Sequence, residues 1–273
     1  MPTANINGVD LFYEVTGDGP PVILHHGYTG SHDGWAGVVP LLSRRFRTIV
    51  MDARGAGDSG RPGDGYTIPQ YAADIIGMAD HLGLDRFTYV GHSMGGVIGM
   101  ELGLEYPQRL EKLVLVAPAP ADGIDVPPSY RERAVALRAR GDRETLFRER
   151  KALSARERPD EAHMRSVERA LSVSDGHYNE SWDAMVDYHR GDDLTRISTP
   201  TLVIAGAADG LLPSNLKDFQ RLPNATLHVF SRVSHGIPYE VPEAFTEVLV
   251  DFLDNSVVTA ATLQAALMAS ARS

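Results

Sequence analysis

The sequence predicts an α/β fold in which a mostly parallel sheet is flanked by helices. Short apolar runs recur along the first part of the chain and again beyond residue 198. Segments with the helical spacing of apolar residues separate these runs, and a glycine-rich turn joins one run to the helix that follows it. Strands that alternate with helices in this way build parallel sheets through βαβ units.

Most of the apolar runs are unbroken, which is typical of strands covered on both faces. Several of them stop at a histidine, an aspartate or a glycine, as expected where a strand reaches the edge of a sheet and a loop begins. The predicted strands span residues 9–15, 21–24, 48–51, 87–90, 113–116, 200–204 and 226–229.

The connecting segments have helical character. Residues 66–82 place apolar side chains three and four positions apart, and Gly83 marks the end of this predicted helix. Residues 94–106 predict a second helix, which Pro107 closes, and residues 242–253 predict a last one. Strand, helix and strand in this order imply right-handed crossovers.

The pattern changes between residues 121 and 197, where strand-like runs vanish. Four Arg- and Glu-rich helices are expected there, at residues 131–140, 143–156, 159–171 and 180–188. We interpret their charges as a solvated face, and their position between two strands predicts a cap over the site. The expected organisation is an α/β core of residues 1–120 and 198–256, a helical cap insertion of residues 121–197, and a C-terminal tail or helix of residues 257–273.

The composition is that of a globular protein, with 43% apolar and 23% charged residues among 273. The 26 Lys and Arg are outnumbered by 36 Asp and Glu, which gives a net charge of −10. Nucleic acids and anionic membranes select clustered positive charge. We therefore expect neither as a partner.

The chain contains no cysteine, which excludes thiolate nucleophiles, thiolate metal sites and disulfides. The first residues lack the apolar segment of a signal peptide, and no apolar run approaches the ~20 residues that span a bilayer. These features predict a cytoplasmic protein. Whether it forms a homodimer stays open.

The strongest chemical signal is the sequence Gly-His-Ser-Met-Gly-Gly at residues 91–96. It matches G-x-S-x-G between a predicted strand and a predicted helix, which is the context of a nucleophile elbow. Glycines on either side of Ser93 remove side chains that would clash in so sharp a turn. The Ser93 hydroxyl would then stand exposed at the N-terminus of a helix, where developing negative charge is favoured.

A serine alcohol is a weak nucleophile and needs a base, which in turn needs an orienting acid. Of the ten histidines, His235 follows the last predicted strand and precedes the last helix. Asp209 lies just beyond the strand at 200–204. Loops at the carboxyl ends of strands are where α/β sites are built, so we predict the triad Ser93, Asp209 and His235.

With these motifs the chain resembles the α/β-hydrolase fold superfamily, whose members carry the triad in the order serine, acid, histidine. Further motifs support the resemblance over roughly residues 5–120 and 198–254. They are His26-Gly27-Tyr28 after a strand, the loop Asp52-Ala-Arg54-Gly-Ala-Gly-Asp-Ser59, Pro213 after the acid, and Glu240, Pro242 and Phe245 after the histidine.

The resemblance implies the α/β-hydrolase fold with an inserted cap, and an oxyanion hole formed by the backbone N–H groups of Tyr28 and Met94. It implies a serine hydrolase that cleaves a carboxylic ester or lactone through an acyl-enzyme, without a cofactor. The elbow serine argues against epoxide hydrolases and haloalkane dehalogenases, which carry aspartate there. A carbon–carbon bond hydrolase of a ring-cleavage pathway, a cofactor-free perhydrolase and a small-molecule receptor stay open. The carbon–carbon hydrolases carry a tryptophan shortly after the histidine, where this chain has residues 236–239, Gly-Ile-Pro-Tyr.

Two further patterns suggest other ligands. His25 and His26 invite a metal, but neighbours on a strand point to opposite faces and no metal-ligand spacing is present, so no metal is expected. Residues 55–60 spell G-x-G-x-x-G, but an Arg-Pro-Gly-Asp-Gly loop follows instead of a helix, so no nucleotide site is expected.

The expected partner is a small, mostly apolar ester or lactone. The aromatic residues considered as walls of its pocket are Tyr28, Trp35, Tyr130, Trp182 and Tyr188.

Overall fold

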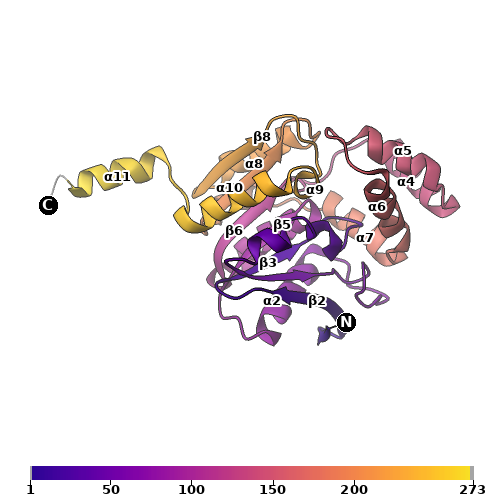
Figure 1. Ribbon diagram of the computed structural model, residues 1–273, viewed down its shortest axis with the longest axis horizontal. Coiled ribbons are helices and arrows are strands. Elements are labelled where there is room, and N and C mark those ends of the chain that lie inside the picture. Colours follow the sequence, from indigo (N-terminus) through magenta and orange to yellow (C-terminus); the bar gives the residue numbers. More distant parts are fainter. Residues whose placement is uncertain (1, 271–273) are drawn as a thin grey trace.

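The computed structural model describes residues 2–270 and shows a three-layer α/β fold (Figure 1). Its central sheet has the strand order β1-β2-β4-β3-β5-β6-β7-β8. The strands β1 and β2 are antiparallel to their neighbours, and the other strands, β3 to β8, run parallel to one another. The strands are β1 (Thr3–Ile6), β2 (Val9–Thr16), β3 (Pro21–His25), β4 (Arg47–Met51), β5 (Phe87–His92), β6 (Leu110–Val116), β7 (Thr201–Gly206) and β8 (Ala225–Phe230).

Helices cover both faces of this sheet because its parallel strands bury side chains on both. In β3, Ile23 joins the core beneath α2 (Ile68–His81) and α3 (Met94–Glu105), whereas Val22 and Leu24 join the opposite core. Phe245 and Leu249 of α10 pack into that second core. The helices beside these are α1 (Val39–Leu42), α8 (Leu212–Arg221) and α9 (Ile237–Glu240), and α10 spans Pro242–Asn255.

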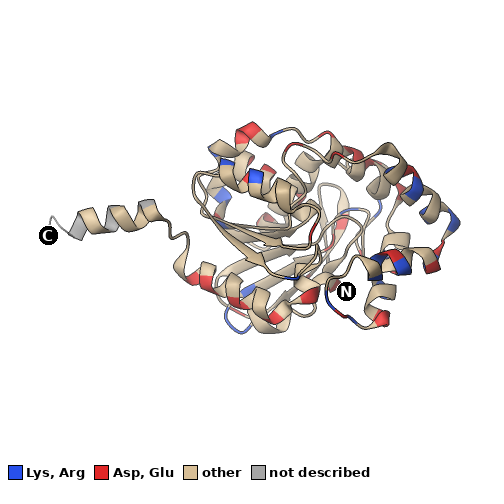
Figure 2. Cartoon of the chain, turned by 90° about the horizontal axis from the view of Figure 1, so that it is seen from above, with Lys and Arg blue, Asp and Glu red and all other residues tan. Residues whose placement is uncertain are grey.

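A helical segment connects β6 to β7 and lies to one side of the sheet (Figure 1). It contains α4 (Pro128–Arg140), α5 (Arg143–Ala152), α6 (Asp160–Ser172) and α7 (Asp175–Val186), followed by a 3₁₀ helix at Gly191–Arg196. The last helix, α7, begins five residues earlier than the sequence predicted because the side chain of Ser174 caps it, accepting the N–H of His177. Blue and red positions both occur along these helices in Figure 2, so the segment carries mixed charge.

The strand β1 and the helices α1, α8 and α9 were not predicted from the sequence. The register of β1 against β2 pairs Thr3 with Phe12 and Ile6 with Val9, so this strand depends on its partner more than on its own four residues. Beyond α10, residues 260–270 form α11, which projects from the body of the molecule (Figure 1). The last three residues of the predicted tail lie outside the described residues. Within the described residues, no helix is long and apolar enough to cross a membrane.

Candidate active site

Ser93 occupies a strained turn between β5 and α3. Its backbone has φ 56° and ψ −112°, in the region that side-chain-bearing residues rarely adopt. The turn is held because the Ser93 N–H donates to the Val116 carbonyl (2.9 Å), while the Ser93 carbonyl accepts the N–H of Ala119 (3.0 Å). A Cβ on Gly91 would lie 2.0 Å from the Gly95 carbonyl oxygen, so this position requires glycine. The geometry is that of a nucleophile elbow.

The structure brings the three predicted triad residues into one hydrogen-bonded chain. Ser93 Oγ lies 2.9 Å from His235 Nε2, and His235 Nδ1 lies 2.8 Å from Asp209 Oδ2. Next to an ionised carboxylate, Nδ1 carries the ring proton, which leaves Nε2 free to accept the serine proton. These residues come from the loops after β5, β7 and β8, so the parallel strands deliver all three to the same edge of the sheet.

Asp209 is placed to stay ionised. Burial alone would raise the pKa of its carboxyl, but the hydrogen bond from His235, the charge of that ring and the N–H of Leu211 outweigh burial and lower the pKa. The Leu211 N–H donates to Asp209 Oδ1 at 3.0 Å. This second donor fixes the carboxylate and leaves Oδ2 for His235.

His92 positions the backbone of His235. Its Nε2 lies 2.8 Å from the His235 carbonyl oxygen, and a backbone carbonyl can only accept, so Nε2 carries the proton. Burial and the neighbouring His235 ring lower the pKa of His92 to about 3, so its ring is neutral at ordinary pH. The residue before the elbow serine thus ties the β8 loop to β5.

The loop after β3 presents a backbone N–H beside Ser93. The Gly27 carbonyl accepts the N–H of Gly30 (2.9 Å) and lies 2.7 Å from His26 Nδ1. His26 Nε2 accepts the N–H of Ala53 (3.0 Å), so in the neutral ring Nδ1 is the donor to Gly27. The C=O and N–H of a trans peptide point in opposite directions, and the Tyr28 N–H therefore points away from His26. A Cβ on Gly27 would lie 2.8 Å from Ser93 Cβ, so this loop closely approaches the serine.

The second predicted oxyanion donor is Met94, the first residue of α3. The N–H groups of a helix's first turn have no acceptor within the helix. Among the described residues, neither Tyr28 nor Met94 donates its N–H to another backbone or side-chain group. Tyr28 lines the cavity beside Ser93, and Met94 directly follows Ser93 in the chain.

The rings of His25 and His26 stack on one another, with centroids 5.1 Å apart and planes 12° from parallel. The expectation that they point to opposite faces is wrong, because β3 ends at His25 and His26 already belongs to the loop. Three of the ring nitrogens lie within hydrogen-bond distance of backbone groups. His25 Nδ1 is 3.0 Å from the His26 carbonyl oxygen, and both nitrogens of His26 have the backbone partners given above.

Asp52 lies beneath the same loop. Its two oxygens accept the N–H of His32 (2.6 Å) and the N–H of Asp58 (2.8 Å), and Oδ2 also lies 2.9 Å from His32 Nδ1. Ligand atoms of His32, Asp52 and Asp58 lie within 4.8 Å of one another, but the carboxylate of Asp52 is used by these hydrogen bonds. Asp52 joins the loop after β3 to the loop after β4. That second loop, residues 52–67, continues without a helix until α2 begins at Ile68.

A cavity of about 210 Å³ opens between the strand-end loops and α5–α6. Its volume lies below the ~300–1,000 Å³ of pockets for drug-sized ligands, so it suits a small substrate. Ser93 and His235 lie on its sheet side. The other lining residues are Gly27, Tyr28, Thr29, Gly30, His92, Arg150, Leu153, Ser154, Arg158, His163, Ser166, Arg169, Ser234, Gly236, Tyr239 and Glu240.

The predicted aromatic walls lie elsewhere, with the exception of Tyr28. Trp35 is 1% exposed and packs against Phe245 in the core below the sheet. Tyr188 is also buried, and its hydroxyl donates to Glu101 of α3 at 3.1 Å. Neither lines the cavity: Trp35 is the last residue of the 3₁₀ helix His32–Trp35, Tyr188 follows α7, and both side chains fill the core.

Tyr130 and Trp182 belong to an aromatic stack outside the cavity. Their rings are 6.3 Å apart, and Tyr130 is 57% exposed. The ring of Tyr28 joins this stack, 5.9 Å from Trp182, and its hydroxyl donates to the carbonyl of Tyr178. Burial raises the pKa of Tyr28 above its ordinary range. Tyr28 therefore anchors α7 with its side chain.

The lining is more polar than the sequence predicted. The side chain of Met94, which follows Ser93, is fully buried in the core and adds no apolar surface to the cavity. Three arginines, Arg150, Arg158 and Arg169, reach the cavity from the helical segment. They were missed because Arg-rich helices usually mark solvated faces. For two other lining residues the helical spacing was informative. In α6, His163 and Ser166 fall on the same helix face as the buried Val167 and Ala170.

Comparisons with known proteins agree with this geometry. The chain matches the family model described as alpha/beta hydrolase fold over residues 20–242. It is 32% identical to a putative carbamate hydrolase of Caulobacter sp. strain K31, over 93% of this chain and 98% of the relative. It is 30% identical to a non-heme chloroperoxidase of Streptomyces lividans, over 90% of this chain and 97% of that one.

A solved esterase from Exiguobacterium antarcticum superposes with a TM-score of 0.83 at 25% identity, covering 93% of this chain and 98% of the esterase. These relatives are named for different reactions and substrates, although they share one fold. The chain belongs to the α/β hydrolase fold family.

Proposed function

We propose that this hydrolase cleaves a carboxylic ester or lactone through an acyl-enzyme on Ser93. The observation that carries the proposal is the hydrogen-bonded chain from Ser93 Oγ through His235 to Asp209, with both links below 3 Å. Ser93 and His235 line a cavity that Tyr28 also lines. The esterase similarity supports an ester as the scissile group.

In the proposed mechanism, His235 Nε2 takes the Ser93 proton as Oγ attacks the substrate carbonyl. The carbonyl oxygen becomes an oxyanion, which the N–H groups of Tyr28 and Met94 stabilise. His235 then returns the proton to the leaving alcohol, and an acyl-enzyme remains. Water, deprotonated by the same histidine, attacks the acyl carbon and releases the acid. Asp209 stabilises the imidazolium in both halves of the reaction.

A second candidate uses the same acyl-enzyme. The similarity to a relative named as a non-heme chloroperoxidase favours a cofactor-free perhydrolase. In that reaction hydrogen peroxide replaces water as the attacking nucleophile, and the product is a peracid instead of an acid. Peracid formation from an ester and peroxide, measured against plain hydrolysis, separates the two candidates.

Turnover of a panel of p-nitrophenyl esters and simple lactones tests the proposal. Ser93→Ala should lower kcat by several orders of magnitude because no acyl-enzyme forms. Ser129→Ala is the matched control, since Ser129 is exposed in the first turn of α4. Turnover in Ser93→Ala that equals the control would contradict the mechanism.

A further inference from the structure

The wall of the cavity opposite Ser93 is cationic, and two of its three arginines lack acidic partners. Arg150 of α5 and Arg158 of the α5–α6 connection both line it, and both are half-buried. Among the described residues, neither guanidinium has a carboxylate within 4.0 Å. The polar contact of Arg150 is neutral: its Nη1 donates to Ser166 Oγ at 2.8 Å.

Several neighbouring basic residues in the helical segment are paired with an acid, whereas others, such as Arg148 and Arg165, are exposed to solvent and unpaired among the described residues. Arg143 pairs with Glu168 at 2.7 Å and Arg133 with Glu149 at 2.6 Å. Lys151, next to Arg150 in sequence, pairs with Asp160 at 2.7 Å. Water can solvate an exposed arginine that lacks an acid, but Arg150 and Arg158 are half-buried and face one cavity without an acid.

Two uncharged groups in the same wall also lack partners. His163 is 3% exposed and lines the cavity, and its imidazole ring makes no hydrogen bond or ion pair to any described residue. The hydroxyl of Ser154 is buried and has no hydrogen-bond partner among the described residues. Buried polar groups are ordinarily hydrogen-bonded, and these two are therefore free to contact a ligand.

The acidic side chain that lines the cavity is already engaged. Glu240 accepts the N–H of Ser234 at 3.1 Å and also the Ser234 hydroxyl. The third cavity arginine, Arg169, pairs with Asp33 at 3.3 Å. Arg158 lies over the Tyr239 ring, 5.1 Å from its centroid, which orients its guanidinium without neutralising it.

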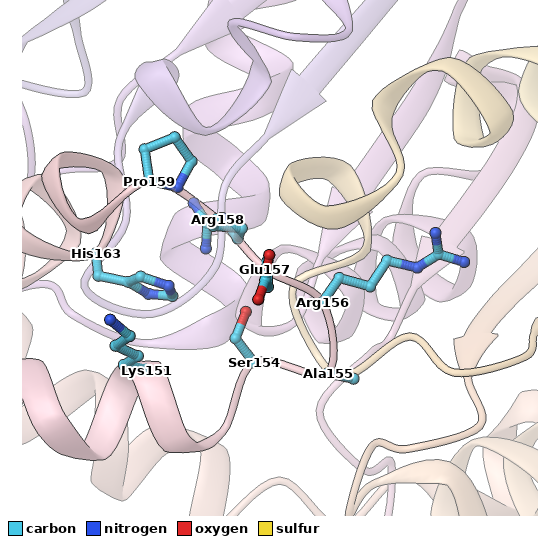
Figure 3. A pocket seen from close by; sticks show the side chains of 8 residues that line it. All are labelled: Lys151, Ser154, Ala155, Arg156, Glu157, Arg158, Pro159 and His163. Carbon is cyan, nitrogen blue, oxygen red and sulfur yellow. The ribbon is translucent and has the colours of Figure 1, made fainter.

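A second hollow continues outward from this wall. Its lining shares Ser154, Arg158 and His163 with the cavity (Figure 3). Lys151 and His163 point toward one another across it, whereas Arg156 extends away (Figure 3). Glu157 also lines this hollow, and Lys151 is paired with Asp160, so Arg158 is the uncompensated charge that the hollow and the cavity share.

We propose that Arg150 and Arg158, together with His163 and Ser154, form a subsite for a carboxylate carried by the substrate. The substrate is then a small ester or lactone with a second, ionised carboxyl group that does not react. The proposal rests on the function proposed above and names its substrate class. Hydrolysis proceeds as before: water adds, the ester bond breaks, and the distal carboxylate is unchanged.

Two pairs of probes test the subsite, one with the carboxylate on the acyl side and one with it on the alcohol side. They are monomethyl glutarate against its neutral monoamide, and γ-acetoxybutyrate against γ-acetoxybutyramide. Proton release gives kcat and KM for each. We expect kcat/KM to favour the anionic member of at least one pair by roughly 10- to 100-fold, as one charged hydrogen bond provides.

Arg150→Met and Arg158→Met should each remove most of that preference, mainly by raising KM for the anionic probe, and Arg150→Lys should restore part of it. Arg148→Met is the matched control, because Arg148 is exposed on the same helix and outside the cavity. It should keep the wild-type preference. Free glutarate should also bind Ser93→Ala, and bind Ser93→Ala/Arg150→Met at least tenfold more weakly.

The two proposals fail in different ways. Ser93-dependent turnover of the neutral probes without any preference for the anionic ones would overturn the subsite and leave the hydrolase. A preference that survives both arginine substitutions would also overturn it. Turnover that does not depend on Ser93 would instead overturn the proposed function.

Discussion

The two walls of the cavity differ in how their polar groups are compensated. On the sheet side, Asp209 holds His235, and His92 holds the His235 backbone, each within 2.8 Å. On the helical side, among the described residues, Arg150 and Arg158 have no carboxylate within 4.0 Å and the ring of His163 has no hydrogen-bond partner. We call the sheet-side wall saturated because hydrogen bonds hold its catalytic side chains in place before substrate arrives. The helical-side wall is unsaturated because its polar side chains remain available to bind a ligand. Under the two proposals, the first wall carries out the chemistry and the second selects the substrate.

The largest expected effect tests the saturated wall. Asp209→Asn removes the carboxylate that keeps the proton on His235 Nδ1, and it should lower kcat by about 10⁴ with an unchanged fold. Steady-state kinetics on the best ester measures this, with circular dichroism as the check on folding. A loss smaller than about tenfold would mean that Asp209 does not orient the base.

The next largest effect is a loss of stability expected when a buried arginine, unlike Arg150, loses the acid with which it is paired. Arg54 and Asp74 form a buried two-pronged ion pair at 2.7 and 2.8 Å. Asp74→Asn leaves the guanidinium uncompensated and should cost about 3–5 kcal/mol of unfolding free energy.

Asp80→Asn is the matched control for that substitution. Asp80 pairs with Arg109 at 2.6 Å, but it is 61% exposed. Breaking such a surface pair should cost less than about 1 kcal/mol. Urea unfolding compares the two variants, and equal losses would contradict the assigned difference in burial.

Acid should destabilise the fold through buried histidines. Burial lowers the pKa of His25, His92 and His177 to about 3, below the ordinary 6.5. As pH falls from 6.5, the unfolded chain takes up protons at these positions and the folded chain does not, so the unfolding free energy falls. Urea unfolding at a series of pH values should show this loss already by about pH 5. Constant stability over that range would show that these rings are not buried neutral.

The smallest expected effect completes the comparison. Arg150→Met removes an uncompensated, half-buried charge, so the unfolding free energy should change by less than about 1 kcal/mol, in either direction. A loss of the size expected for Asp74→Asn would mean that Arg150 supports the fold. It would then contradict a role reserved for substrate.

The sheet-side wall was predictable because its signals are local. A strand-turn-helix with glycines around Ser93, an acid after one strand and a histidine after another are each visible in a few residues. The parallel order of strands then determines where they meet. The strands from β2 to β8 and the helices α2 and α3 were predicted for the same reason, with ends shifted by a few residues.

The helical wall was not predictable to that degree. Its helices were expected, but the side chains that face the cavity depend on how α5 and α6 pack against the strand-end loops. Trp35 and Tyr188 show the same limit: a large aromatic near a site in sequence is placed by the core that it fills. Arg150 could be distinguished from its paired neighbours only once the positions of the carboxylates were known.

Labelling of the nucleophile tests the central claim most directly. A p-nitrophenyl phosphonate ester reacts with an activated serine, which displaces p-nitrophenol and keeps the phosphonyl group on Oγ. Intact-mass analysis should show one adduct per chain, located by peptide mapping at Ser93 and absent from Ser93→Ala. Equal labelling of Ser93→Ala, or unlabelled wild-type protein that still hydrolyses esters, would contradict the account.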